Sequence, residues 1–234
     1  MPKAAPDSAE FENLIEALGN DLASAAIHLR LYKDLRAAVP SYLREFNESN
    51  TFWQLTLTAH LQHGLHSLAR AYDQERSSSL SLRRWLETIR ENLHLFEADR
   101  FRERLKDNQF VSSLAEHVRP PDVKTLDEHI AYCSGTNPLV QRLVIIRNNA
   151  LAHRSYHHAS RGQSAYTDYP LSFDTLDELV DKGFLIYNTY NQLFRAVQQS
   201  RQIIGHDDFL HVLDAVRRDL QRFEHEIKQE IGSD

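Results

Sequence analysis

The stretch that decides the fold is Leu143-Val-Ile-Ile-Arg-Asn-Asn-Ala-Leu-Ala-His-Arg154, in the second half of the chain. At a helical step of about 100° per residue, its aliphatic side chains share one broad face. Arg147 lies in the middle of that apolar face. A guanidinium keeps its charge and is costly to bury without a partner. The position of Arg147 therefore predicts an anionic side chain, a water-filled cleft or a bound phosphate beside it.

His153 follows in the same stretch, about 120° further around an ideal helix than Arg147. One straight helix therefore cannot point both side chains at the same atom. They converge either where the helix end frays near His153 or with the help of a second chain. Ile145 lies on the otherwise polar side with Gln141 and Asn149. This favours the second chain, and we expect a homodimer with these helices near its two-fold axis.

A basic segment surrounds the stretch, because no acidic residue lies between Glu128 and Asp168 in a chain of net charge -6. Its basic and imidazole side chains include Arg142, Arg147, His153, Arg154, His157, His158 and Arg161. Arginine binds phosphate oxygens with paired N–H groups. We therefore expect the segment to bind RNA in a salt-dependent way, with Arg147, Arg154 and Arg161 on successive phosphates.

The composition is that of an ordinary globular chain, with 41% hydrophobic and 26% charged residues among 234. The single cysteine, Cys133, excludes an internal disulfide and a multi-cysteine zinc site, and it fits a reducing cytoplasm. No apolar run approaches the roughly 18 to 20 residues of a membrane span, and no signal peptide is apparent. We expect a cytoplasmic protein without a membrane partner.

Helices account for the pattern of the whole chain, because 7 glycines and 7 prolines interrupt it and no run alternates like a β-strand. We predict an all-α fold, an antiparallel helical bundle with peripheral helices. Asn137 is expected to cap the central helix at Pro138, and Asp174 to cap a later helix that Gly205 ends. The expected helices cover about residues 8–39, 51–72, 82–93, 96–108, 122–133, 138–154, 174–204 and 209–231.

Histidines do not form a recognisable metal motif. His60, His63 and His66 recur at a spacing that drifts around a helix, and His153 and His157 have no third ligand at an obvious spacing. We expect no metal and no cofactor.

The remaining chemical candidate is the group Arg147, Asn148, Asn149 and His153, since no glycine-rich phosphate loop or nucleophile elbow is present. Arginine can bind a phosphate, the amides can orient it, and histidine can move a proton near neutral pH. These are the requirements for cleaving RNA through its own 2′-hydroxyl without a metal. The alternative is a structural arginine and a helix-end histidine.

The segment from Arg147 to His153 resembles the signature of the HEPN superfamily (higher eukaryotes and prokaryotes nucleotide-binding), in which a short spacer separates an arginine from a histidine. Phe52-Trp53, Leu68-Ala-Arg-Ala-Tyr-Asp73 and Ser79-Leu-Ser-Leu82 precede it in an order similar to the AbiU-type abortive-infection branch. This resemblance spans Thr51 to Gln199.

The resemblance implies a helical bundle that dimerises so that two Arg/His motifs face each other across a cleft. We expect residues 1–50 to form a helical extension packed on the bundle, 51–200 the HEPN-like bundle and 201–234 a C-terminal helix. Active members of the superfamily are metal-independent endoribonucleases of toxin-antitoxin and abortive-infection systems. Others are non-catalytic modules that bind RNA, a nucleotide or a partner protein. An antitoxin or a nucleotidyltransferase-like protein is the implied partner.

The implied catalytic pair is Arg147 and His153, with Asn148 as the polar residue after the arginine. Tyr72 and Asp73 match a branch motif and serve either the site or the packing. Position alone adds further supporting or phosphate-binding candidates, which are Asn149, Arg154, Tyr156 and Arg161.

Overall fold

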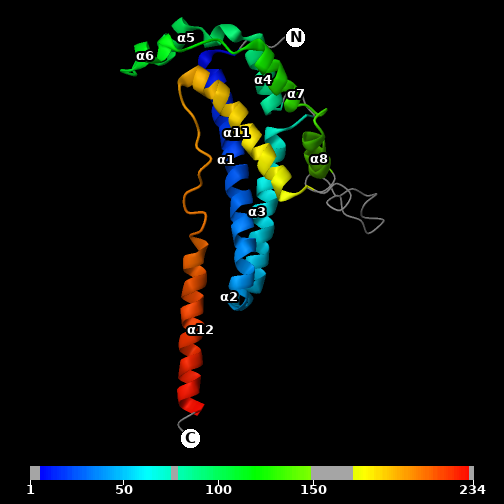
Figure 1. Ribbon diagram of the computed structural model, residues 1–234, viewed down its shortest axis with the longest axis vertical. Coiled ribbons are helices and arrows are strands. Elements are labelled where there is room, and N and C mark those ends of the chain that lie inside the picture. The colour runs from blue at the N-terminus through cyan, green and yellow to red at the C-terminus, as the bar shows by residue number, and fades with distance from the viewer. Residues whose placement is uncertain (1–5, 75–78, 149–170, 232–234) are drawn as a thin grey trace. The chain divides into compact units, whose positions relative to one another are not determined.

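The structure is a computed structural model that describes residues 6–74, 79–148 and 171–231 (Figure 1). Every regular element among them is a helix, which confirms the predicted all-α class. The elements are α1 (Ser8–Ala38), η1 (Val39–Ser41), α2 (Leu43–Glu48), α3 (Asn50–Ala71), α4 (Leu82–Glu91), η2 (Leu93–Phe96), α5 (Ala98–Arg104), α6 (Val111–Glu116), α7 (Val123–Tyr132), α8 (Pro138–Ile146), α11 (Phe173–Arg195) and α12 (Phe209–Ile231).

Side-chain caps explain where three of the helices begin. Ser81, Asp122 and Asn137 each accept a hydrogen bond from a backbone amide in the first turn of α4, α7 and α8. Pro138 occupies the first turn of α8, where its missing N–H costs nothing. The predicted start of the central helix is therefore confirmed.

The start of α11 differs from the prediction. Ser172 is the cap, because its hydroxyl accepts a hydrogen bond from the Thr175 amide at 3.1 Å. Asp174 lies inside the first turn, where its negative charge favours the positive end of the helix dipole. The prediction that Asp174 is the cap is wrong.

The end of α11 also differs, since the helix stops at Arg195 and not at Gly205. Ala196 adopts a left-handed conformation with φ 55°, which ends the helix. The Asn191 side chain is fully buried, and its amide donates to the Val197 carbonyl at 2.8 Å. This hydrogen bond holds the chain after the helix against α11, an effect that apolar spacing does not reveal.

The described chain forms two compact units. Unit 1 comprises residues 1–25 and 65–201, and unit 2 comprises 26–64 and 202–234, each without the undescribed residues. The assignment of domains to residues 1–50, 51–200 and 201–234 stays a prediction.

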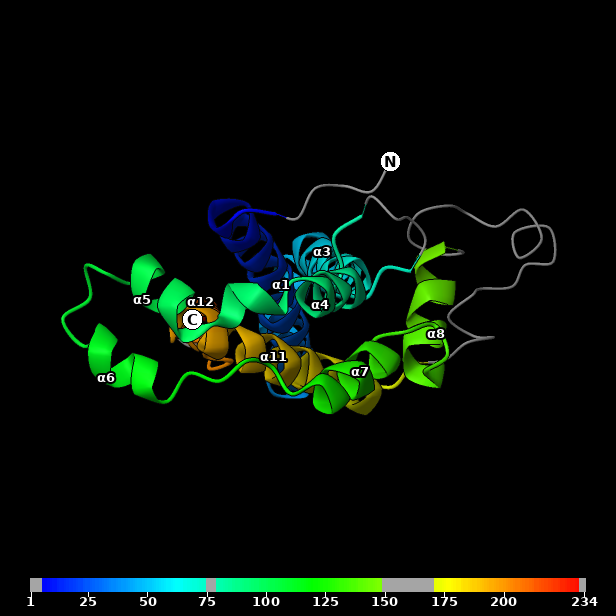
Figure 2. The same cartoon turned by 90° about the horizontal axis from the view of Figure 1, so that it is seen from above.

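Aromatic rings form the core of unit 1. The ring of Phe11 in α1 lies 4.7 Å from that of Phe194 in α11 and 6.2 Å from that of Trp85 in α4, and all three side chains are fully buried. Such clusters bury much apolar surface and favour tilted or offset rings. Helix α4 also packs against α7. Within unit 1, α8 lies at the end opposite α5 and α6 (Figure 2).

In unit 2, α12 packs against α2. Leu35 of α1, Phe46 of α2, Trp53 of α3 and Leu213 of α12 form its buried core. No helix among the described residues is long and apolar enough to cross a membrane.

Candidate functional site

Helix α8 places Arg147 at the edge of unit 1. Val140, Leu143 and Ile146 are its buried residues, so one face of the helix packs into the core. Arg147 follows directly with helical dihedral angles, and its amide donates to the carbonyls of Leu143 and Val144. Its side chain therefore starts from the buried side of a helix.

The anionic partner of Arg147 is Asp73, which lies just after the end of α3. Arg147 Nη1 donates to Asp73 Oδ1 at 2.6 Å, and the two side chains are only 15% and 14% exposed. Arg147 Nε also donates to Asn148 Oδ1 at 2.9 Å. The carboxylate balances the charge of the guanidinium. Without this partner, removing the guanidinium from water would cost free energy. Asp73 therefore contacts the Arg/His motif directly.

Tyr72 serves the packing of the same segment. Its ring is fully buried, and its hydroxyl donates to the Leu179 carbonyl of α11 at 2.7 Å. Burial raises the pKa of this phenol well above its ordinary value. A Cβ added at Gly183 would lie 3.3 Å from the Tyr72 hydroxyl, so the two helices approach closely. Tyr72 thus fixes the end of α3 against α11. This contact positions Asp73, the next residue, beside Arg147.

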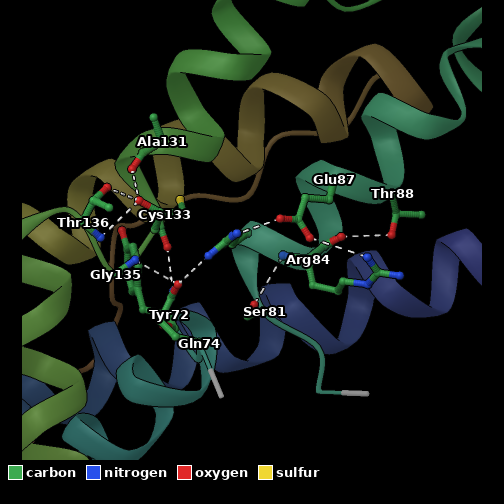
Figure 3. Close-up of polar contacts among 12 residues, drawn as sticks. Tyr72, Gln74, Ser81, Arg84, Glu87, Thr88, Ala131, Cys133, Gly135 and Thr136 are labelled. Atoms are coloured by element: carbon green, nitrogen blue, oxygen red, sulfur yellow. Dashed lines mark hydrogen bonds and ion pairs between the residues drawn. The ribbon is translucent and has the colours of Figure 1, made fainter. Parts of the chain in front are cut away.

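Gln74 joins the end of α3 to the turn that precedes α8 (Figure 3). Its Nε2 donates to the carbonyls of Tyr72 at 2.8 Å and Cys133 at 2.7 Å. Its Oε1 accepts from the Gly135 amide at 3.0 Å and from Arg83 Nη1 at 3.3 Å. One side chain therefore links the end of α3, α4 and the α7–α8 turn. These hydrogen bonds fix the start of α8 relative to the segment that contains Asp73.

Sequence reasoning missed Gln74. A single glutamine outside any helix has no periodicity, and its place directly after the Tyr72-Asp73 pair is the one sequence signal that points to it.

Cys133 is a structural residue beside this network. It is fully buried, and burial raises the pKa of its thiol to about 12. The thiol is therefore uncharged near neutral pH, and a thiol is a poor nucleophile.

The other predicted site residues lie outside the described residues. These are Asn149, His153, Arg154, Tyr156 and Arg161. The structure thus brings together Arg147, Asn148 and Asp73, and the convergence of Arg147 with His153 stays a prediction.

A second polar cluster, which we call the histidine cluster, lies in unit 2 and consists of His28 of α1 with His60 and His63 of α3. The Nδ1 atoms of His28 and His60 are 2.9 Å apart, and the His28 and His63 ring centroids are 4.2 Å apart. Burial, followed by the neighbouring imidazoles, lowers the pKa of His28, and burial also lowers that of His60. Among the described residues, no group of three or more histidine, cysteine or acidic side chains is arranged to hold a metal ion.

Comparison with known proteins identifies the family. Neither the curated proteins nor the solved structures contain a significant match to this chain. The family model described as AbiU2, a HEPN family, matches residues 8–223 and so covers α1 to most of α12. The match includes the Tyr72-Asp73 segment as well as Arg147, and it extends beyond the range over which the motifs resemble the family. The chain therefore belongs to the AbiU2 family of abortive-infection-related HEPN domains.

Proposed function

We propose that this protein is an endoribonuclease of a phage-defence or toxin-antitoxin system that cuts RNA through its 2′-hydroxyl without a metal ion. The observation that carries the proposal is the Asp73–Arg147 pair. It fixes a guanidinium, still 15% exposed, directly before the segment that contains His153. A preorganised cation is what a phosphate needs when charge develops on it.

In the proposed reaction, His153 takes the proton from the ribose 2′-hydroxyl while Arg147 stabilises charge on the phosphate. The 2′-oxygen bonds to phosphorus and the bond to the 5′-oxygen breaks. The His153 imidazolium returns its proton to that oxygen, which leaves as a hydroxyl. The products are a 2′,3′-cyclic phosphate and a 5′-hydroxyl end. Asp73 acts as a positioning residue, because it reaches the phosphate only through Arg147.

The remaining predicted residues have supporting roles in this proposal. Asn148 orients Arg147, and Asn149, Arg154, Tyr156 and Arg161 contact the RNA. A homodimer with two motifs across a cleft would bring the side chains together. An antitoxin or a nucleotidyltransferase-like protein in the cytoplasm would restrain the activity.

A second candidate function is a non-catalytic HEPN dimer that binds RNA, a nucleotide or a partner protein. The same ion pair supports it, because Asp73 balances the charge of Arg147 at low exposure. In this case Arg147 is a structural residue.

Cleavage of mixed cellular RNA by the purified protein separates the two candidates. We expect cleavage in the presence of EDTA, cyclic phosphate ends, and no cleavage of DNA, which lacks the nucleophile. Arg147→Ala and His153→Ala should each lower the rate by orders of magnitude without changing the helical content. Arg142→Ala is the matched control, because Arg142 is an exposed arginine of the same helix.

Two results would overturn the assignment: activity that survives at the wild-type level in both variants, or activity that disappears only with the chelator. No cleavage by the wild type, together with RNA binding that weakens as salt rises, would support the non-catalytic module.

A further inference from the structure

Helix α12 has an apolar face that its own unit covers only at the first turns. Leu213 is its one buried residue among those described. Other apolar side chains are exposed along the helix, with Val212 at 53%, Phe223 at 60% and Ile231 at 73%. In Figure 1, the second half of α12 continues past α2, its neighbour in unit 2.

An ion pair with Arg44 of α2 holds Glu224, which lies early in this second half. Every described residue after Glu224 is exposed on the helix, including Ile227 and Ile231. An unsupported helix end is marginal in water, since most helical stability in proteins comes from packing of an apolar face. An apolar stripe on such an end indicates an interaction surface.

The positions of these side chains are self-complementary. The apolar positions are symmetric about the point between Gln221 and Arg222. The number of residues from this point back to Leu220, Val216 and Val212 equals the number forward to Phe223, Ile227 and Ile231, respectively. Two copies of α12 placed antiparallel about that point would therefore pair Val212 with Ile231, Val216 with Ile227, and Leu220 with Phe223, each pair twice. A two-fold interface needs this property, because the same patch must fit itself.

A cavity beside Leu220 gives the aromatic side chain a place to enter. It has a volume of about 270 Å³ and lies between α2 and α12. Its lining residues are apolar Pro40, Leu43 and Leu220 and polar Ser41, Arg44, Glu45, Arg217 and Gln221. The antiparallel pairing brings Phe223 of a second copy next to Leu220. The cavity is large enough for such a ring.

From these observations we propose that α12 is a self-association surface that binds α12 of a second copy in antiparallel orientation. This surface is separate from the dimer of the Arg/His motifs and does not depend on the proposed RNA cleavage.

The first test compares the masses of the full-length wild type and two variants by sedimentation velocity over a concentration series. Ile227→Glu introduces a charge on the apolar stripe and should weaken one association step by more than about tenfold. Gln229→Glu introduces the same charge on the opposite side of the helix and should leave that step unchanged. Ile227 is exposed, so folding of the variant, checked by its circular dichroism, should be intact.

Identical mass curves for Ile227→Glu and Gln229→Glu would overturn the proposal. A wild type that shows no association, or one that needs an added partner protein before α12 is covered, would also overturn it.

The second test reads the direction of the pair with a short bismaleimide cross-linker. In the antiparallel arrangement, the two copies of residue 223 are offset by only about 5 Å along the helix axis, and those of residue 231 by about 28 Å. Phe223→Cys should therefore cross-link to itself, and Ile231→Cys should not. Cys133 is buried and does not compete. Cross-linking through Cys at position 231 would show a parallel pair and overturn the arrangement.

Discussion

Helix α3 contributes to two polar clusters that are built in opposite ways. Just past its end, Asp73 pairs with Arg147, so unlike charges meet at 2.6 Å. Earlier in the helix, His60 and His63 contact His28 of α1, so three imidazole rings lie next to one another. Both clusters join segments far apart in the sequence, and both are partly buried.

The difference determines which protonation states each cluster tolerates. The Asp73–Arg147 pair needs both groups charged, and removal of either partner leaves a charge at low exposure. The histidine cluster needs at least one neutral ring, because a hydrogen bond between the Nδ1 atoms of His28 and His60 requires one of these two nitrogens to be without a proton. The first cluster therefore depends on a pair of opposite charges, whereas protonation of both rings disrupts the second.

The largest expected effect comes from breaking the ion pair on one side. Asp73→Ala should lower the free energy of unfolding by about 2 to 4 kcal/mol, because Arg147 loses its carboxylate while only 15% exposed. Chemical denaturation measures this. The control is Asp99→Ala, which removes an ion pair with Arg102 in which the Asp99 side chain is 94% exposed and should cost less than about 1 kcal/mol.

Removing both partners gives the sharper test of the pair. Asp73→Leu combined with Arg147→Met should recover most of the lost stability, since no charge is left unbalanced. If the double variant is as unstable as the sum of the single variants, the two side chains are not coupled and the positioning role of Asp73 is wrong.

A smaller effect is expected at Gln74, which orders the first cluster without carrying charge. Gln74→Leu leaves the Cys133 carbonyl and the Gly135 amide without this partner, at a cost of about 1 to 3 kcal/mol. If the proposed function holds, RNA cleavage should also fall, because α8 and its Arg147 are no longer fixed relative to Asp73. The matched control is Gln54→Leu on the exposed part of α3, where the side chain bonds only to Asn50 among the contacts described. Equal loss in both variants would contradict the role of Gln74.

The sequence predicts local features of this fold well and long-range polar contacts poorly. The all-α class and the cap at Asn137 follow from nearby residues, because spacing and capping are local. The apolar placement of Arg147 correctly predicts a need for an anion, but nothing in its helix identifies Asp73 as that anion. The left-handed residue that ends α11 is Ala196 and not a glycine, so the sequence does not predict this helix end.

The histidine cluster shows the same limit. The spacing of His60, His63 and His66 on α3 gives no single face, and His28 lies on another helix. The structure brings His28 to two of them because α1 and α3 pack together. Residues that meet between two helices have no fixed separation in the sequence, so the sequence does not identify them. The chemistry of His153 stays a prediction, since it lies outside the described residues.

The smallest expected effect is the pH dependence of the histidine cluster. Burial lowers the pKa of His28 and His60 from the ordinary value of 6.5, so the unfolded chain binds more protons than the folded chain below that pH. Stability from these groups is therefore fully present above about pH 6.5 and is lost as the pH falls toward the lowered values. His60→Gln should flatten the dependence of unfolding free energy on pH between 7 and 5, measured by urea denaturation. His225→Gln, which replaces an exposed histidine of α12, is the control variant. A slope that stays the same in His60→Gln would show that the cluster does not titrate on folding and would remove the contrast with the Asp73–Arg147 pair.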